Sequence, residues 1–216
     1  MKLIRNAAAK IVTVSDVLVE LVSKMNHKQK EIVHKIFEFY MNQYRELKKT
    51  HNVESVVSTI HEEIDKKMEE SSARIETGEK VTCRNGCSFC CFLKVDINDD
   101  EAMLLTEYSR KIGLDIDYEK LEKQKVKTDA EFLKLPYKDR CCIFLNKENS
   151  CSVYEHRPSA CRKLLVVSKV ECCDPENKSE TQIKKLVNIE AEILSSSSLN
   201  VRESGGMVEM LLKTKN

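Results

Sequence analysis

The spacing of apolar residues over the first eighty positions predicts three helices. From Ile4 to Met25 the apolar positions advance in alternating steps of three and four, which places them on one helical face. Similar spacing predicts a second helix over residues 28–49 and a third that begins after the N-cap Asn52. The expected inward positions are Ile4, Ala7, Ile11, Val14, Leu18, Leu21 and Met25, then Ile32, Ile36, Phe37, Tyr40, Tyr44 and Leu47, then Val53, Val57, Ile60, Ile64 and Met68. We interpret these faces as an intramolecular bundle, although the same heptad spacing could also form a dimer seam.

Capping and turn residues mark two further helices. Asn98 with Glu101 three residues later is a capping box, and Gly113 is typical of the end of the helix that follows. Pro158 suits the first turn of a short helix that carries Cys161.

The later part of the chain predicts shorter elements. Two runs, residues 142–145 and 151–154, flank a polar stretch and predict a small hairpin. A last helix is expected over residues 179–194, and the serines at 195–198 indicate a flexible break. The apolar tail over residues 205–212 fits a strand or a helix equally well.

Composition changes near Lys80, because the first eighty residues contain neither cysteine nor proline and only one glycine. We therefore predict a mainly α protein in which an N-terminal helical bundle, residues 1–80, packs on a small irregular α+β metal-binding domain, residues 81–175. A C-terminal helix and tail, residues 176–216, are expected to pack on that core.

Charge and hydropathy exclude several classes of protein. Lys plus Arg number 36 and Asp plus Glu 35, so no basic surface for nucleic acid is expected. Lys10 and Asp16 interrupt the apolar positions at the N-terminus before a signal-peptide core can form. We expect a cytoplasmic protein that does not span a membrane, is a monomer or a weak dimer, and has a protein as its partner or substrate.

All ten cysteines fall between Cys83 and Cys173, which points to metal binding. A cytoplasmic protein is kept reduced and gains little from disulfides. The alternative is a secreted disulfide scaffold, which the even number of cysteines allows but the length of the chain and the absence of a signal peptide disfavour.

The run Cys83-Arg-Asn-Gly-Cys87-Ser-Phe-Cys90-Cys91 is the most specific local motif. Gaps of three and two residues let a tight loop turn several thiolates toward one point, and Gly86 relieves the backbone crowding. The hairpin and the turn after it return further thiolates to this region, namely Cys142, Cys151 and Cys161. Cys141 and Cys172 each neighbour a better candidate, and adjacent side chains diverge where the backbone is extended, so we expect them to be bystanders.

Together with Cys142-Ile-Phe-Leu145 and Cys151-Ser-Val-Tyr154-Glu-His-Arg157-Pro158-Ser-Ala-Cys161-Arg162, this motif resembles a cysteine-cluster family of zinc- or iron-chelating proteins. That family includes flagellin lysine N-methylases, and the three-residue first gap resembles the methylase-like branch. The resemblance implies metal-ligand roles for the seven cysteines above and for Cys173. It also implies that Arg157 and Arg162 bind and brace the cofactor.

The sequence leaves the metal and its use open. Seven or eight thiolates exceed one tetrahedral site, so two zinc ions, one cubane iron–sulfur cluster ([4Fe–4S]) with spare cysteines, or a mixed arrangement all fit. The spacing Cys83-x3-Cys87-x2-Cys90 is also typical of radical enzymes that use S-adenosylmethionine, but the repeated strand–helix units of their barrel are not predicted here. His156 is expected to be a turn residue and not a ligand. The leading interpretation is a metal-binding protein; the resemblance adds a cluster-dependent lysine methylase using S-adenosylmethionine, and a zinc-stabilised interaction module is the third alternative.

Overall fold

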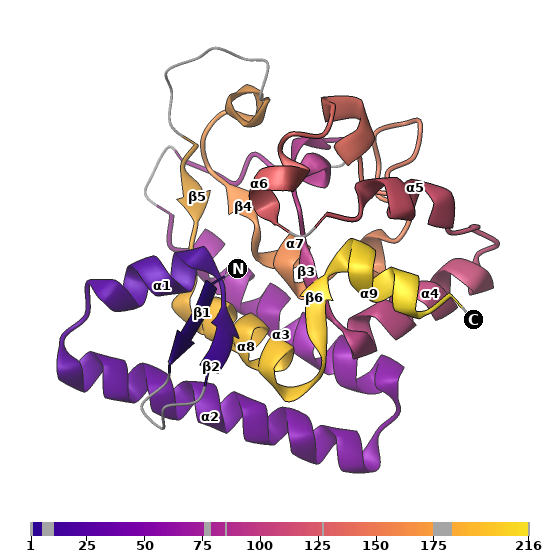
Figure 1. Ribbon diagram of the computed structural model, residues 1–216. Helices are drawn as coiled ribbons and strands as arrows, with labels where there is room; N and C mark the ends of the chain where they lie inside the picture. Colours follow the sequence, from indigo (N-terminus) through magenta and orange to yellow (C-terminus); the bar gives the residue numbers. More distant parts are fainter. Residues whose placement is uncertain are drawn as a thin grey trace.

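The chain folds into a mainly α-helical structure, as the sequence predicts. Helices α2 (His27–Thr50), α3 (Val53–Ser72) and α8 (Ile189–Val201) pack against one another, and Figure 1 shows the irregular cysteine-bearing region on the opposite side from α2. The computed structural model describes residues 2–5, 11–75, 79–84, 86–126, 128–174 and 183–215.

The N-terminus forms a hairpin, so the single helix predicted over residues 4–25 is wrong. Strands β1 (Lys2–Arg5) and β2 (Ile11–Val14) pair antiparallel. Ala7, which belongs to the predicted helical face, lies outside the described residues. The register pairs Lys2 with Val14, Leu3 with Thr13, Ile4 with Val12 and Arg5 with Ile11.

The first helix, α1 (Asp16–Ser23), begins only after Ser15. The Ser15 hydroxyl accepts a hydrogen bond from the amide of Leu18 (3.1 Å) and so caps the helix. The preceding run of β-branched residues in β2 favours extended backbone. These two local preferences outweigh the helical spacing of the apolar positions.

Helices α2 and α3 confirm the next two predictions. Asn26 and Gln29 form a capping box at the start of α2, and Asn52 caps α3 by accepting from the Ser55 amide (2.8 Å). Ile32 was expected to point inward but is 49% exposed. The buried face follows the neighbouring position Val33, because one residue turns the helix by about 100°. The buried side chains are Phe37, Met41 and Tyr44 on α2 and Val56, Val57, Ile60, His61, Ile64 and Met68 on α3.

Helix α8 differs from the prediction at both ends. It begins only after the N-cap Asn188, and it continues through the four serines that were expected to break it. Two of the serine hydroxyls donate to backbone carbonyls, Ser197 to that of Ile193 (2.8 Å) and Ser198 to that of Ser195 (2.8 Å), and the Ser196 hydroxyl accepts from the Ser15 amide (3.5 Å). Small, internally bonded side chains can be buried without orphaned polar groups, which is why the helix can pack closely against α2.

The residues before α8 are extended where a helix was expected. Strand β5 (Lys185–Leu186) pairs antiparallel with β4 (Leu165–Val166), and residues 179–182 lie outside the described residues. Two apolar residues of this stretch, Ile183 and Val187, are exposed.

The cysteine-bearing half is built on helix α4 (Asp99–Lys111), which follows strand β3 (Asp96–Asn98). The predicted capping box is present: the Asn98 side chain accepts from the Glu101 amide (2.8 Å), and the Glu101 carboxylate accepts from the Asn98 amide (3.4 Å). Gly113, with φ +69°, follows the helix in the left-handed region, as expected of a helix end.

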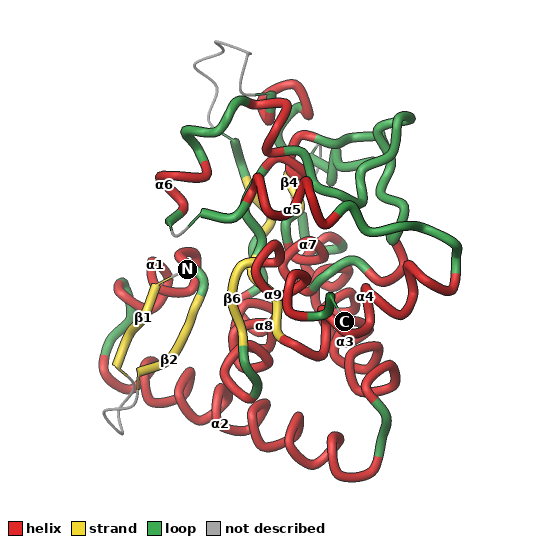
Figure 2. Tube along the Cα trace, turned by 45° about the vertical axis from the view of Figure 1, so that its right-hand side comes forward, coloured by secondary structure: helices red, strands yellow, loops and turns green. Residues whose placement is uncertain are grey.

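The C-terminal tail contains both structures that the sequence allowed. Strand β6 (Ser204–Gly206) pairs antiparallel with β3, and helix α9 (Met207–Lys213) follows and packs on α4 (Figure 2). The predicted hairpin is reduced to one antiparallel bridge between Leu145 and Cys151. The short helix after Pro158 is α7 (Ser159–Lys163). Other helices are α5 (Tyr118–Gln124), α6 (Asp129–Phe132) and the 3-10 helices Phe89–Phe92, Tyr137–Arg140, Tyr154–His156 and Val170–Cys173.

The left-handed backbone at Gly113 gives a simple test of the fold. A Cβ there meets no atom within 4 Å, so substitution is opposed only by backbone strain. Gly113→Ala is expected to lower the free energy of unfolding by about 1 kcal/mol, and Gly113→Asn by less, because Asn tolerates this conformation. Denaturant titration of the two variants checks the order; equal stability of Gly113→Ala and wild type would contradict it.

Candidate metal centre

Seven cysteines line one cavity of about 390 Å³. They come from two parts of the chain, residues 83–91 and residues 142–161, which are separated by helices α4, α5 and α6. The lining also includes apolar side chains such as Phe144 and Val153 and the basic residues Arg84, Arg140 and Arg157. The seven are Cys83, Cys87, Cys90, Cys91, Cys142, Cys151 and Cys161, all of which the sequence predicts to be ligands.

The first cysteine loop is held by tight turns. The Cys87 amide donates to the Arg84 carbonyl (3.0 Å), and Gly86 has φ +81°, which a side chain would rarely adopt. The chain then enters the 3-10 helix Phe89–Phe92, where the Cys91 amide donates to the Ser88 carbonyl (2.8 Å).

Backbone hydrogen bonds bring the returning cysteines to this loop. The Cys142 amide donates to the Cys91 carbonyl (2.8 Å), which joins the two parts of the chain directly. The Val166 amide donates to the Cys83 thiol sulfur (3.4 Å). Cys161 lies in α7, and Cys151 lies at the bridge with Leu145.

The thiols are close enough to affect one another's protonation. A hydrogen bond from the Cys91 thiol lowers the pKa of Cys90 to about 7, and the same bond, together with burial, raises the pKa of Cys91. Burial raises the pKa of Cys142 to about 12. Burial also raises the pKa of Cys161, and the negative charges of Cys142 and Cys90 add to this effect. Cys90 therefore interacts with thiols from both parts of the chain.

The three remaining cysteines lie outside the cavity lining. Cys173 is adjacent to the first loop: burial raises its pKa, and the charges of Cys87 and Cys83 add to the rise. The Cys141 thiol donates to the carbonyl of Cys142 (3.5 Å). All ten cysteines are free, without disulfides.

The two motif arginines occupy different places. Arg157 lines the cavity, and its guanidinium carbon lies 4.0 Å from the centre of the Tyr154 ring. Arg162 is buried behind the cavity, where it donates to the Asp65 carboxylate and to the carbonyls of Glu155 and Arg157. Arg162 thus holds the backbone turn between Cys151 and Cys161.

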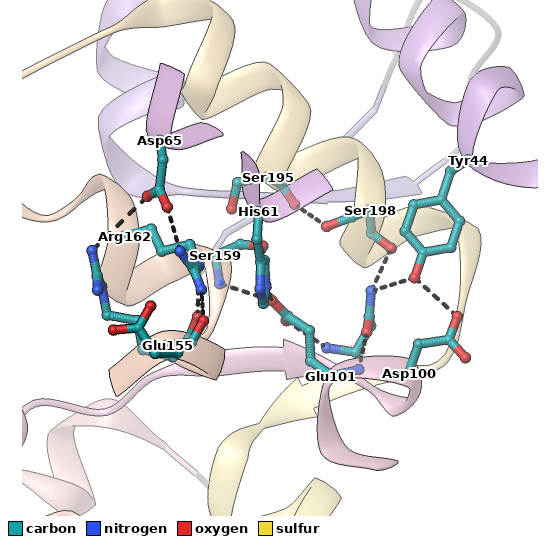
Figure 3. Close-up of polar contacts among 12 residues, drawn as sticks. Tyr44, His61, Asp65, Asp100, Glu101, Glu155, Ser159, Arg162, Ser195 and Ser198 are labelled. Carbon is teal, nitrogen blue, oxygen red and sulfur yellow. Dashed lines mark hydrogen bonds and ion pairs between the residues drawn. The ribbon is translucent and has the colours of Figure 1, made fainter. Parts of the chain in front are cut away.

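A buried polar network lies beneath α7 (Figure 3). Glu101 accepts hydrogen bonds from His61 and from both the amide and the hydroxyl of Ser159. The adjacent Asp100 accepts from Tyr44 (2.9 Å). The sequence identifies Glu101 only as a helix cap. Its hydrogen bonds to His61 and Ser159 join residues 40 and 58 positions away, and no local motif predicts them.

The seven cysteine thiols around the cavity are suitable ligands for a soft metal ion. Thiolates suit zinc and iron–sulfur clusters alike. The Arg140 Nε is buried and has no hydrogen-bond partner among the described residues, and a metal–thiolate group with net negative charge offers the acceptor it lacks. Within the same described residues, no three Cys, His, Asp or Glu side chains already stand at coordinating distance from one point, so the thiols surround the cavity without converging.

Comparison with known proteins agrees with the cysteine pattern. Residues 82–186 match the CxxCxxCC family, described as "Putative zinc- or iron-chelating domain", which confirms the resemblance drawn from the motifs. No curated protein and no solved structure matches the chain. Among the described residues, no helix is both long and apolar enough to cross a lipid bilayer.

Proposed function

We propose that the segment matching the zinc- or iron-chelating family binds its metal through the seven cysteines that line the cavity, with Cys173 at its edge. The observation that carries this proposal is the gathering of seven of the eight predicted ligands, from two distant parts of the chain, around one space. An isolated buried cysteine usually serves as a small apolar residue, but a group of seven cysteines around one cavity is better explained as a set of metal ligands. The chemistry requires reduced thiols, which favours the cytoplasm as the location.

The set of cysteines favours a cluster over single ions. Adjacent cysteines such as Cys90 and Cys91 suit a cluster site or its delivery. Seven thiolates also exceed the four that a cubane cluster takes, which leaves cysteines for delivery or exchange. We therefore favour an iron–sulfur cluster, of the [4Fe–4S] type, over a pair of zinc ions. Such a cluster supplies electron transfer or a Lewis-acidic iron, according to whether one iron keeps an open position.

The metal is identified by anaerobic purification of the full chain, followed by elemental analysis and a visible spectrum. A brown protein that contains iron and sulfide and absorbs blue light supports the cluster. A colourless protein with stoichiometric zinc supports chelation but overturns the cluster. A protein that binds neither metal in either preparation overturns the proposal as a whole.

Adjacent cysteines provide a matched test of the ligand assignment. Cys142→Ser is expected to reduce bound metal by at least about tenfold at fixed chelator concentration, because serine is a poor ligand for soft metals. Cys141→Ser removes the neighbouring thiol, which lies outside the cavity lining, and is expected to bind like wild type. Elemental analysis after chelator challenge measures both. Equal loss in the two variants would contradict the assignment.

A further inference from the structure

Glu101 joins three helices at one buried point. Its Oε1 accepts from the Ser159 amide (2.8 Å), the Ser159 hydroxyl (2.8 Å) and His61 Nε2 (3.0 Å). Ser159 is the first residue of α7, and His61 lies on α3, so Figure 3 shows the carboxylate of α4 between the other two helices. Only 3% of Glu101 is exposed.

This carboxylate is held in its charged form. Burial alone raises the pKa of Glu101, but the hydrogen bonds from His61 and Ser159 outweigh burial and leave the pKa lowered. A charged acceptor makes stronger hydrogen bonds than a neutral one. The contact therefore fixes the start of α7 firmly, two residues before Cys161.

The same face of α3 holds the other part of α7. Asp65 lies four residues after His61, which places both side chains on one side of the helix. Asp65 accepts from Arg162, the residue that follows Cys161. Helix α3 thus contacts α7 on both sides of Cys161, through Ser159 by way of Glu101 and through Arg162 directly.

We infer that Glu101 and His61 are positioning residues for the metal ligand Cys161, and that helix α3 is therefore a working part of the metal centre. This inference rests on the proposed function, since it concerns the placement of one proposed ligand. The N-terminal helices then do more than cover a surface: they set the position of a thiol that the chain supplies more than eighty residues later. Neither residue touches the metal itself.

Asp100 supplies a matched control. It is adjacent to Glu101 in α4 and equally buried, and it also accepts hydrogen bonds from an N-terminal helix, from Tyr44 (2.9 Å) and Lys48 (2.7 Å). It makes no hydrogen bond to α7. Asp100→Asn is therefore expected to lower stability without changing the metal affinity of the folded protein.

The test compares Glu101→Gln with Asp100→Asn in the full chain, with Zn²⁺ as the probe and a coloured chelator as competitor. Glu101→Gln is expected to weaken Zn²⁺ binding by about 10- to 100-fold, the usual effect of losing a residue that orients a ligand. Asp100→Asn is expected to stay within about twofold of wild type. The direction of the change in Zn²⁺ affinity separates positioning from electrostatics. Loss of the negative charge of Glu101 favours the Cys161 thiolate, so an electrostatic effect alone would tighten Zn²⁺ binding.

A double-mutant cycle shows whether the effect passes through Cys161. In a Cys161→Ser background, Glu101→Gln is expected to change Zn²⁺ affinity by less than about twofold, because its target is gone. Unchanged or tighter binding in Glu101→Gln, equal weakening in both carboxylate variants, or an undiminished effect in Cys161→Ser would each overturn the inference. Should Glu101→Gln not fold, Ser159→Ala removes one hydrogen bond to Glu101 and is expected to weaken binding in the same direction. A wild-type chain that does not bind Zn²⁺ or iron overturns the proposed function instead.

Discussion

Complete removal of the metal is expected to unfold the cysteine-bearing region while leaving helices α2, α3 and α8 folded. A structural zinc site contributes on the order of 10–16 kcal/mol, comparable to the entire net stability of a typical domain, about 5–15 kcal/mol. Apart from helix α4 and the short helices α5, α6 and α7, the described residues of this region form 3-10 turns, one isolated bridge and short strands, which have little stability of their own. The buried clusters shared by α2, α3 and α8 contain no cysteine.

Circular dichroism and limited proteolysis measure this outcome. After chelation, new cleavage sites are expected within about residues 83–174, whereas the fragment containing α2 and α3 should resist. Returning the metal to the same sample is the control, and it should restore protection. An unchanged spectrum and cleavage pattern after full removal would show that the metal does not support this region.

The sequence predicts those parts of the fold that depend on local signals. Helices α2 and α3 combine long, regular apolar spacing with Asn caps, and the cap at Asn98 and the end at Gly113 depend only on neighbouring residues. The predictions for the N-terminus and for α8 were wrong for different reasons. At the N-terminus, the Ser15 cap and the β-branched run of β2 outweigh the helical spacing. In α8, packing against α2 and hydrogen bonds to backbone carbonyls keep the serines inside the helix.

The sequence predicts the cysteines of the candidate site but not the residues that hold those cysteines in place. Thiols at short, regular gaps point to metal whatever the fold, and seven of the eight expected ligands line the cavity. By contrast, Glu101 meets Ser159 across 58 residues and Asp65 meets Arg162 across 97. A single sequence carries no signal for such pairs, since Asp and Glu on helices are ordinarily solvated.

The second large effect is expected at Arg162. Arg162→Met removes three hydrogen-bond donors and leaves Asp65 and the carbonyls of Glu155 and Arg157 without them. Breaking a buried pair costs about 3–5 kcal/mol. Asp65, whose side chain is 35% exposed, can be rehydrated, which places the loss near the lower figure. At about 2–4 °C per kcal/mol for a chain of this size, the thermal midpoint of the metal-loaded protein should fall by about 6–12 °C.

Arg202 is the comparison for this substitution, because it also pairs with an aspartate, Asp99, but its side chain is 38% exposed against 7% for Arg162. Its Nε also lies 3.6 Å from the buried Asp100 carboxylate, and Arg202→Met is expected to cost about 1 kcal/mol, less than Arg162→Met, because water reaches the Arg202 guanidinium. Arg162→Lys separates charge from geometry: it keeps the positive charge but cannot span all three acceptors, so most of the loss should persist. Both comparisons require the same metal excess, since bound metal itself raises the midpoint. If Arg162→Met and Arg202→Met lower the thermal midpoint equally, Arg162 does not hold the turn between Cys151 and Cys161. If Arg162→Lys has the midpoint of wild type, the positive charge alone holds that turn, and the hydrogen bonds to three acceptors are not needed.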